Sequence, residues 1–316
     1  PLFSKCDANS ATSRCGEIAA DATCSAHLLQ FDSVHGTWDR NCIAVDETIR
    51  VDDHVIMHHS DATVGGADWS NCDIVIEATG RHHRQPGTLQ RYFEQGVKKV
   101  IVAAPTEGAL NIVYGINDHL YDPVQHNLVT AASCTTNCLA PMCKVLHDHW
   151  GIVRGFMTTI HSYTNDQKLL DVYHSDLRRA RATALSMIPT TTGAAKAVAL
   201  VLPELSGKLN GLAIRVPTPN VSLVDLVATV EKSGVTVSDI NEALKQASEE
   251  SLSGILGFSD APLVSIDYNG SSLSSIVDGP TTYVVDNMVK VLSWYDNEAG
   301  YSHRMVDLAA MVGKEL

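Results

Sequence analysis

Three short apolar runs in the first half of the chain constrain its fold more strongly than any other feature. They span residues 72–80, 99–105 and 128–132. Runs without polar alternation suit parallel strands that are covered on both faces. Helix-length segments separate the runs, and the segment 86–96 has a proline near its start and a glycine at its end, which predicts a crossover helix. We therefore expect an α/β chain with a doubly wound parallel sheet.

The second half of the chain has a different pattern. Apolar and polar residues alternate in four runs, which predicts half-buried antiparallel strands over residues 211–216, 222–230, 263–268 and 289–295. Ser238 is the expected N-cap of a helix over 239–250, and residues 298–312 predict a closing helix. A second domain of α+β type, with a mixed or antiparallel sheet, is the expected result.

Composition limits the kinds of partner. The chain has 316 residues, which suggests two domains at about 150 residues each. Its 23 lysine and arginine residues against 36 acidic residues give a formal net charge of −13, which repels nucleic acid and anionic membranes. No apolar run reaches the roughly 18–20 residues of a membrane span, and the first ten residues do not resemble a secretory signal. We expect a cytoplasmic protein without nucleic-acid or membrane partners.

The cysteines predict reduced thiols rather than a disulfide framework. Eight cysteines occur in the chain, whereas disulfide scaffolds are typical of small secreted domains. Cys6, Cys15 and Cys24 recur at intervals of nine residues, but they form no C-x-x-C pair. We therefore expect no metal site.

The segment 131–144 has the sequence AASCTTNCLAPMCK, which predicts that Cys134 lies where a strand runs into a helix. Free N–H groups and the helix dipole at such a junction lower the pKa of a thiol, and the same N–H groups can receive an oxyanion. Cys134 is therefore a candidate nucleophile, with a buried structural cysteine as the alternative. Of the 14 histidines, His161 lies at the end of an apolar run and is the best candidate for its base, although a lone histidine at a strand end is often structural.

Six motifs together resemble one family, the phosphorylating glyceraldehyde-3-phosphate dehydrogenases. The motifs, in the order of the family, are ASCTTNCLAP at 132–141, IHSYTNDQ at 160–167, DLRRARA at 176–182, IPTTTGAAKA at 188–197, AIRVPTPNVS at 213–222 and WYDNEAGY at 294–301. The resemblance begins near Gly16 and continues almost to the end of the chain. It implies a Rossmann-type dinucleotide-binding domain and a catalytic domain.

The resemblance also implies a reaction and the residues that perform it. Cys134 would attack the aldehyde of glyceraldehyde 3-phosphate, a hydride would pass to NAD, and phosphate would release the thioester as an acyl phosphate. His161 would act as base, and as a cation it would hold Cys134 ionised. Residues that match the site for the terminal phosphate of the substrate are Thr164, Asp166 and Arg215. Residues that match the site for inorganic phosphate are Ser133, Thr135, Arg179, Thr192 and Gly193.

Five residues match cofactor contacts of the family. Asn297 and Tyr301 match residues at the nicotinamide, and Thr79 and Gly80 match a strand end in the dinucleotide cleft. Glu17 matches the acidic residue at the adenosine ribose and favours NAD, although NADP stays open.

The first residues depart from the family pattern. The glycine-rich loop G-x-G-x-x-G, which lets the backbone approach a pyrophosphate, does not occur in the chain, and residues 1–14 carry no apolar strand. We therefore expect a truncated or replaced N-terminus and no strand before Glu17. The expected dinucleotide-binding domain covers residues 1–133 and is completed by the helix 297–316, and the catalytic domain covers 134–296.

Two other functions stay open at this point. Without the glycine-rich loop, the chain could be a non-catalytic relative that binds partners or oligomerises. The segments 27–36, 104–111 and 117–123 look like the branch associated with arsenate resistance, in which arsenate replaces phosphate. Family members are generally homotetramers, so a homotetramer is expected by analogy.

Overall fold

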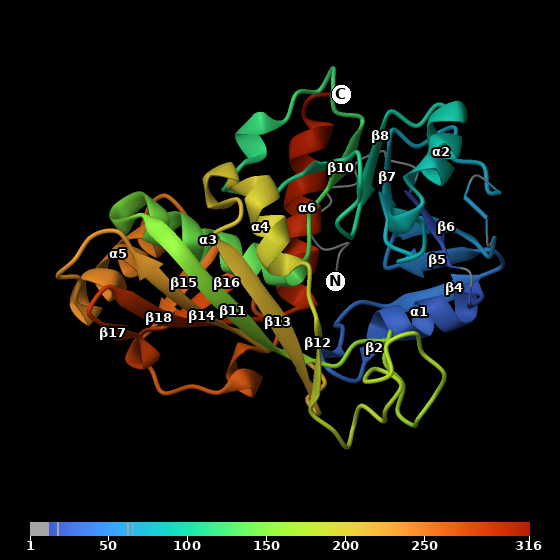
Figure 1. Ribbon diagram of the computed structural model, residues 1–316. Helices are drawn as coiled ribbons and strands as arrows, with labels where there is room; N and C mark the ends of the chain where they lie inside the picture. Colours follow the sequence, from blue (N-terminus) through green and yellow to red (C-terminus); the bar gives the residue numbers. More distant parts are fainter. Residues whose placement is uncertain (1–12, 18, 62, 65) are drawn as a thin grey trace. The chain divides into compact units, whose positions relative to one another are not determined.

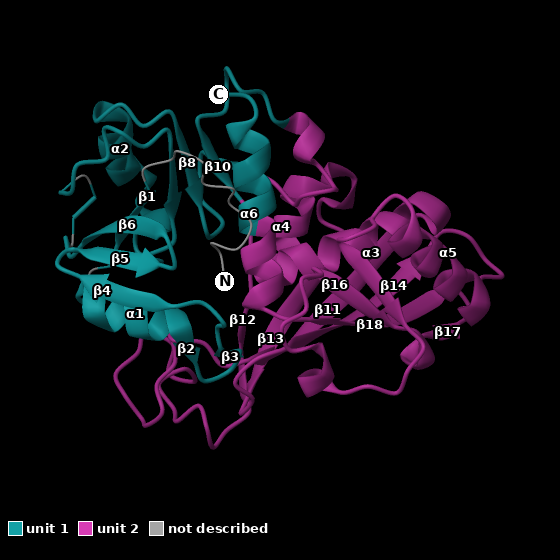
Figure 2. Cartoon of the chain, turned by 180° about the vertical axis from the view of Figure 1, so that it is seen from behind, with its two compact units in different colours: residues 1–110, 121–130, 305–316 teal, residues 111–120, 131–304 magenta. Residues whose placement is uncertain are grey.

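The computed structural model describes residues 13–17, 19–61, 63–64 and 66–316 (Figure 1). It divides into two compact units (Figure 2). Unit 1 consists of residues 1–110, 121–130 and 305–316, and unit 2 consists of residues 111–120 and 131–304. Both units combine helices with sheets, which confirms the α/β class.

The three apolar runs of the first half are neighbouring strands in unit 1. They form β7 (Ile74–Glu77), β8 (Lys99–Val102) and β10 (Leu128–Thr130), and β8 pairs in parallel with the other two. β9 (Leu110–Asn111) follows β10 in the strand order. All four residues of β8 are buried, as a continuous apolar run predicts for a central parallel strand. The predicted parallel sheet is confirmed.

A second sheet of unit 1 corrects the expectation for the N-terminal segment. β1 (Ser13–Gly16) pairs in parallel with β6 (His54–His59), so a strand does precede Glu17. β5 (Thr48–Val51) and β4 (Cys42–Val45) continue this sheet in antiparallel order. No apolar run marks β1, because its side chains are half-buried or exposed and it is the outermost strand of this sheet among the described residues.

The helices of unit 1 are short. α1 (Ala22–Gln30) is capped by Asp21, which accepts a hydrogen bond from Cys24 N at 2.8 Å. The predicted crossover helix at 86–96 consists of a 3₁₀ turn (Pro86–Leu89) that leads into α2 (Gln90–Glu94). A small ribbon pairs β2 (Phe31–Asp32) with β3 (Gly36–Thr37). The longer closing helix α6 (Ala299–Gly313), which begins in unit 2 and ends in unit 1, confirms the prediction for the C-terminal segment.

Unit 2 contains one eight-stranded mixed sheet. Its strands in spatial order are β12 (Ile188–Thr191), β13 (Leu209–Val216), β11 (Ile152–Ser162), β14 (Ser222–Val230), β18 (Met288–Tyr295), β16 (Ser275–Asp278) and β15 (Leu256–Ser259), with β17 (Tyr283–Val285) also paired to β18. β11 and β13 are parallel, as are β15 and β16, and the other pairs are antiparallel. The predicted mixed sheet of the second half is confirmed.

Three helices lie against one face of the unit 2 sheet (Figure 1): α3 (Cys134–Trp150), α4 (Ala194–Val201) and α5 (Val237–Glu249). β14 alternates strictly between buried and half-buried residues, so Val224 and Leu226 face the helices while Asp225 faces away. Leu139, Met142 and other fully buried residues of α3 complete this core. The core anchors α3, whose first residue is Cys134.

One predicted strand of the second half is wrong. The run 263–268 is not a strand but ends in a 3₁₀ turn (Ser265–Tyr268), in which Asp267 accepts a hydrogen bond from Val264 N at 2.8 Å. The ring of Tyr268 stacks on Trp294 at 5.5 Å, so its burial comes from a turn that packs against the sheet.

The other short 3₁₀ turns are His82–Arg84, Asp118–Leu120, Pro203–Leu205 and Gly279–Thr281.

The N-cap of α5 is Thr236 and not Ser238. Thr236 accepts a hydrogen bond from Asp239 N, and the Asp239 carboxylate accepts one from Thr236 N at 2.9 Å. This reciprocal arrangement satisfies two backbone donors, whereas Ser238 bonds only to the side chain of Glu242. The helix therefore begins two residues earlier than predicted.

Two observations concern thiols and membranes. The cysteines within the described ranges are all free, and Cys6 lies outside those ranges. In the described part of the chain, no helix has the length and apolar character needed to cross a bilayer.

The capping box gives a stability prediction. Thr236→Ala removes the cap and should lower the free energy of unfolding by about 1 kcal/mol, measured by urea denaturation. Ser238→Ala is the matched control and should change it by less than about 0.5 kcal/mol, because Ser238 caps nothing. Equal losses in the two variants would contradict the assignment of the cap.

Candidate active site

The turn before α3 places a cysteine at the first position of the helix. Ser133 has an extended backbone, and its Oγ accepts a hydrogen bond from Thr136 N at 3.1 Å. Asn137 Nδ2 donates to the carbonyl oxygens of Ala131 at 2.8 Å and Ser133 at 2.9 Å. These bonds fix the turn, so the predicted position of Cys134 at the start of a helix is confirmed.

Cys134 faces His161 directly. The distance from Cys134 Sγ to His161 Nε2 is 3.6 Å, and His161 is the penultimate residue of β11. His161 Nδ1 lies 2.7 Å from the carbonyl oxygen of Ser162. A carbonyl oxygen only accepts, so Nδ1 carries the proton of the neutral ring and Nε2 is left as an acceptor. The ring therefore presents a basic nitrogen to the thiol.

A half-buried guanidinium lies on the other side of the imidazole. Arg215 on β13 is the register partner of His161 on β11. Its Nη1 donates to Ser162 O at 2.9 Å and to Thr164 Oγ1 at 3.1 Å, and it lies 3.1 Å from His161 Nδ1. A second positive charge on the imidazole would be repelled at this distance.

This environment corrects the expected charge state of the pair. Burial, and after it the charge of Arg215, lowers the pKa of His161 to about 4. Burial also raises the pKa of the Cys134 thiol, although the Thr135 hydroxyl, Arg215 and the backbone at the helix start act in the opposite direction. The expectations of a lowered thiol pKa and of a histidine cation are therefore wrong here, because desolvation outweighs the helix terminus. Near neutral pH a neutral thiol faces a neutral imidazole.

Sequence reasoning missed a tyrosine beneath the pair. The Tyr295 hydroxyl is hydrogen-bonded to Thr135 Oγ1 at 3.0 Å and to Thr159 Oγ1 at 2.9 Å. Its ring stands edge-on to His161, with centroids 6.0 Å apart. Tyr295 is buried, and burial raises its pKa well above the usual value. The available signal was a tyrosine at a buried position of an alternating strand, where its hydroxyl needs a partner.

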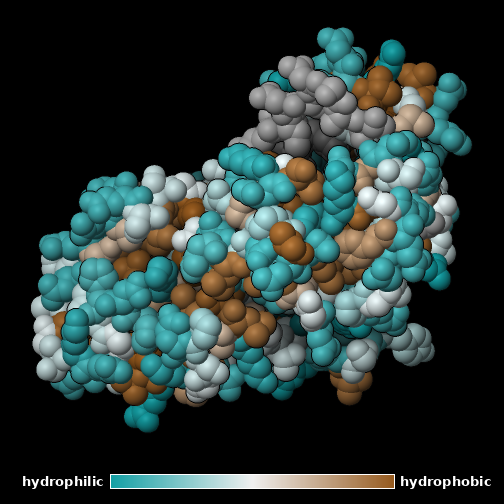
Figure 3. All heavy atoms as spheres, turned by 90° about the horizontal axis from the view of Figure 1, so that it is seen from above, coloured by the Kyte–Doolittle hydropathy of each residue, from teal (hydrophilic) through white to brown (hydrophobic). Residues whose placement is uncertain are grey.

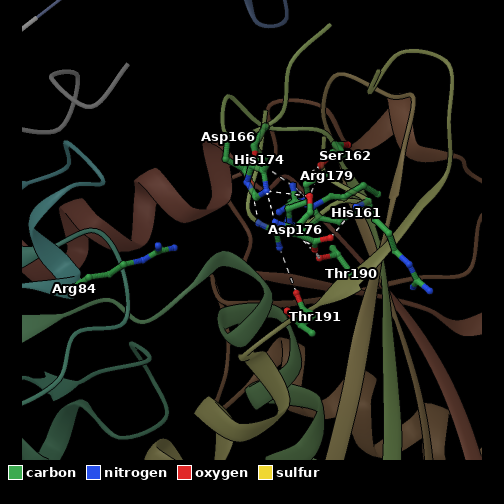
Figure 4. A network of polar contacts seen from close by, with 12 residues as sticks. Arg84, His161, Ser162, Asp166, His174, Asp176, Arg179, Thr190 and Thr191 are labelled. Atoms are coloured by element: carbon green, nitrogen blue, oxygen red, sulfur yellow. Dashed lines mark hydrogen bonds and ion pairs between the residues drawn. The ribbon is translucent and has the colours of Figure 1, made fainter. Parts of the chain in front are cut away.

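Arg179 joins the two groups of predicted anion-binding residues (Figure 4). Its Nη1 forms an ion pair with Asp166 at 2.8 Å, and its Nε donates to Thr190 Oγ1 at 2.9 Å. Asp176 lies 3.8 Å from Nε and accepts from the same threonine hydroxyl at 2.8 Å. The Arg179 guanidinium is therefore held between the carboxylates of Asp166 and Asp176. The sequence alone did not place these two carboxylates in one site.

Thr164 and Asp166 lie beside Arg215. The Thr164 hydroxyl donates to Asp166 Oδ1 and accepts from Arg215 Nη1. Burial opposes ionisation of Asp166, but the Thr164 hydrogen bond and the charges of Arg215 and Arg179 lower its pKa below the ordinary value. The predicted set Thr164, Asp166 and Arg215 is thus one connected group of side chains.

The remaining anion candidates lie at helix starts. Thr192 and Gly193 directly precede α4, and Thr192 Oγ1 accepts from Ala194 N at 3.2 Å. Gly193 provides no side-chain cap, so the first N–H groups of α4 are not capped by it. Ser133 caps α3, which packs against α4. Helix starts with N–H groups of this kind bind anions.

Two of the predicted cofactor residues belong to unit 2. Asn297 Oδ1 accepts a hydrogen bond from Ser222 Oγ at 2.8 Å. The Tyr301 hydroxyl donates to Ala132 O at 3.1 Å, and burial raises its pKa. Tyr301 therefore contacts the turn that carries Cys134.

The other three predicted cofactor residues follow parallel strands of unit 1. Glu17 comes directly after β1 with an exposed side chain, and its N–H donates to His59 O at 2.9 Å. Thr79 and Gly80 come after β7, where Thr79 N donates to Glu77 Oε1 at 2.9 Å and Gly80 has a φ of +71°. Cofactors of doubly wound sheets bind beyond such carboxyl ends of strands.

A small hollow of unit 1 lies at these strand ends. Its lining includes Gly16 at the end of β1, Glu77 and Thr79 at the end of β7, and the rings of Trp69 and Tyr92. Tyr92 donates to Glu77 Oε2 at 3.1 Å. Thr79 N donates to the other oxygen of the same carboxylate, so both Glu77 oxygens already have partners within the protein. Among the residues described, no group of three or more metal-ligating side chains could hold a metal ion.

The lowered pKa of His161 predicts destabilisation by acid. In the unfolded chain this histidine takes up a proton near pH 6.5, whereas the folded chain does so at about 4. The unfolded state binds more protons between these values, so the free energy of unfolding falls as the pH falls through this window. The loss attributable to His161 should be roughly 3 kcal/mol. Urea denaturation at both ends of this pH window should show that the free energy of unfolding falls less in His161→Gln than in the wild type. Equal falls in the two proteins would contradict the assignment.

The charge of Arg215 gives a second prediction. Arg215→Met should raise the pKa of His161, because it removes a neighbouring positive charge, and should raise the pKa of Cys134 for the same reason. Proton NMR of the imidazole and the pH dependence of thiol alkylation measure the two shifts. Arg178→Met is the matched control, since this exposed arginine donates to Pro189 O and not to the pair. A downward shift of either pKa would contradict the electrostatic account.

Comparisons with known proteins agree with the geometry. Residues 133–297 match the family model described as glyceraldehyde 3-phosphate dehydrogenase, C-terminal domain, and residues 14–85 match the NAD binding domain of the same family. The glyceraldehyde-3-phosphate dehydrogenase of Geobacillus stearothermophilus is 56% identical, with 93% of this chain and 89% of the relative covered.

Two further relatives carry the same name. Glyceraldehyde-3-phosphate dehydrogenase 1 of Bacillus cereus is 55% identical, with 92% of this chain and 87% of the relative covered. The protein of that name in Bacillus subtilis is 53% identical, with 93% and 89% covered. The match extends over both domains of the family and includes the turn that carries Cys134, so this chain belongs to the glyceraldehyde-3-phosphate dehydrogenase family.

Proposed function

We propose that this chain oxidises glyceraldehyde 3-phosphate with NAD and inorganic phosphate to an acyl phosphate. The observation that carries the proposal is the 3.6 Å approach of Cys134 Sγ to His161 Nε2 at the start of α3. Membership in the family supports it. No feature of the described residues favours a non-catalytic role or arsenate over this reaction.

The first step joins the thiol to the aldehyde. As Cys134 Sγ attacks the carbonyl carbon, His161 Nε2 takes the thiol proton, and the carbonyl oxygen becomes an oxyanion. N–H groups at the start of α3 stabilise this oxyanion. The low pKa of His161 makes its cation a strong acid, which passes the proton to the oxyanion and gives a neutral hemithioacetal.

The second step leaves a thioester on Cys134. NAD, when bound, accepts the hydride, and Glu17, Thr79, Gly80, Asn297 and Tyr301 would hold it. His161 Nε2 removes the hydroxyl proton of the hemithioacetal at the same time. Phosphate then attacks the thioester carbonyl, the acyl phosphate departs, and the Cys134 thiolate recovers a proton from His161. This cycle returns the neutral pair.

Two anion sites would hold the phosphates. Thr164, Asp166 and Arg215 would form the site for the terminal phosphate of the substrate. The Arg215 guanidinium would be its charged donor, and the Asp166 carboxylate would hold the Thr164 hydroxyl rather than bind the phosphate itself. Residues for inorganic phosphate would be Ser133, Thr135, Arg179, Thr192 and Gly193. The exposed Gly193 before α4 and the Arg179 guanidinium support this assignment.

The proposed assignment of functions to the two domains follows the family. Residues 1–133 with 297–316 would bind the dinucleotide, and residues 134–296 would carry the chemistry. The Glu17 carboxylate favours the ribose hydroxyl of NAD and would repel the additional phosphate of NADP.

We also propose a homotetramer in the cytoplasm. The segment 163–187 exposes Leu170, Tyr173, Leu185 and Met187, and the free face of the unit 2 sheet exposes Phe156. Figure 3 shows that hydrophobic side chains are also exposed among hydrophilic ones on the face seen from above. Exposed apolar side chains of this kind are typical of subunit interfaces.

The experiment is an absorbance assay for reduced nicotinamide. The chain mixed with NAD, phosphate and glyceraldehyde 3-phosphate should reduce NAD, and Cys134→Ser should abolish the reaction. His161→Gln should slow it by roughly 10²- to 10⁴-fold, because the proton acceptor is lost. Cys143→Ser is the matched control, since this buried thiol lies in the core of α3 and should leave the rate within about threefold.

Other outcomes separate the alternatives. A wild-type chain without activity would overturn the proposal and favour a non-catalytic role. Reduction of NAD with arsenate but not with phosphate would favour the arsenate reaction.

A further inference from the structure

Ser222 connects two residues of the proposed site that lie on different strands. It is the first residue of β14 and is 1% exposed. Its Oγ accepts a hydrogen bond from Ser162 N at 3.1 Å and donates to Asn297 Oδ1 at 2.8 Å. Ser162 follows His161 on β11, and Asn297 follows the end of β18.

The hydroxyl of Ser222 can satisfy both partners in only one arrangement. Ser162 N is a donor, so Ser222 must accept from it. The single proton of Ser222 is then available to donate, and a buried hydroxyl that fails to donate loses free energy. Asn297 satisfies this proton only with its carbonyl oxygen toward Ser222. The Asn297 NH₂ group therefore points away from Ser222.

The same peptide group also holds the imidazole. The carbonyl oxygen of Ser162 accepts from His161 Nδ1 at 2.7 Å, while its N–H donates to Ser222. Hydrogen bonds on both sides of Ser162 thus fix the tautomer of His161 and the direction of the Asn297 amide.

The backbone before Ser222 is strained. Val221 has a φ of +66°, a region that β-branched residues rarely adopt. Its carbonyl oxygen accepts from Ser162 Oγ at 2.7 Å, so the strained conformation is held by the same residue that bonds to Ser222. Strain of this kind persists where the surroundings fix it and is frequent at functional sites.

We propose that Ser222 is a positioning residue that fixes the Asn297 amide so that its NH₂ group donates to the carboxamide oxygen of nicotinamide. This inference rests on the proposed function. Without the Ser222 hydroxyl, the amide can rotate and present its oxygen, which cannot donate to a carbonyl group.

The test is equilibrium binding of NAD and its thionicotinamide analogue, measured by calorimetry. Sulfur accepts hydrogen bonds more weakly than oxygen, so the wild type should prefer NAD by about three- to tenfold. Ser222→Ala should reduce this preference toward one. Ser222→Thr retains a hydroxyl and should restore it. In the activity assay, Ser222→Ala should raise KM for NAD more than it lowers kcat.

The matched control is Ser293→Ala. Ser293 is also fully buried, lies on the neighbouring strand β18, and bonds to Ser275 rather than to Asn297. It should keep the wild-type preference. An active wild type whose preference is unchanged in Ser222→Ala overturns this inference alone, whereas a wild type with no affinity for NAD overturns the proposed function as well.

Discussion

A hydrogen bond from His161 Nδ1 to the carbonyl oxygen of Ser162 determines the chemistry available to this chain. It assigns the ring proton to the side away from the thiol and leaves Nε2 to receive a proton from Cys134. The alternative tautomer would direct an N–H toward the sulfur. Arg215 donates to the same carbonyl oxygen, so one peptide group aligns both the base and the nearby cation.

The neutral resting pair has an electrostatic origin. Burial penalises any charge on Cys134 and His161, and Arg215 penalises a second cation in particular. In the mechanism proposed above, ionisation of Cys134 is therefore favoured only when a carbonyl group accepts the electrons of the sulfur. The protonated His161, a strong acid because of its low pKa, then donates its proton to the developing oxyanion. The environment that makes the thiol harder to ionise thus also makes the His161 cation a better proton donor.

The sequence predicted those parts that local patterns govern. Continuous apolar runs predicted the parallel strands β7, β8 and β10, and the strand-to-helix pattern of residues 131–144 predicted that Cys134 lies at the start of a helix. The predictions of no strand before Glu17 and of a strand over residues 263–268 were wrong. The partial burial of β1 and the stacking of Tyr268 on Trp294 both depend on residues that are distant in the sequence. The expected pKa shifts of Cys134 and His161 had the wrong direction for a related reason, since desolvation and the proximity of Arg215 arise only in the folded chain. Tyr295 and Ser222 were missed because their roles depend on contacts across the sheet.

The ion pair of Arg179 with Asp166 has a consequence for salt dependence. A guanidinium that already has a carboxylate counter-ion does not gain a full new charge pair when a phosphate arrives, because the incoming anion competes with the resident one. Binding is then an exchange of partners. If Arg179 binds inorganic phosphate as proposed, the affinity for phosphate should therefore decline less steeply with ionic strength than it would at an arginine facing water.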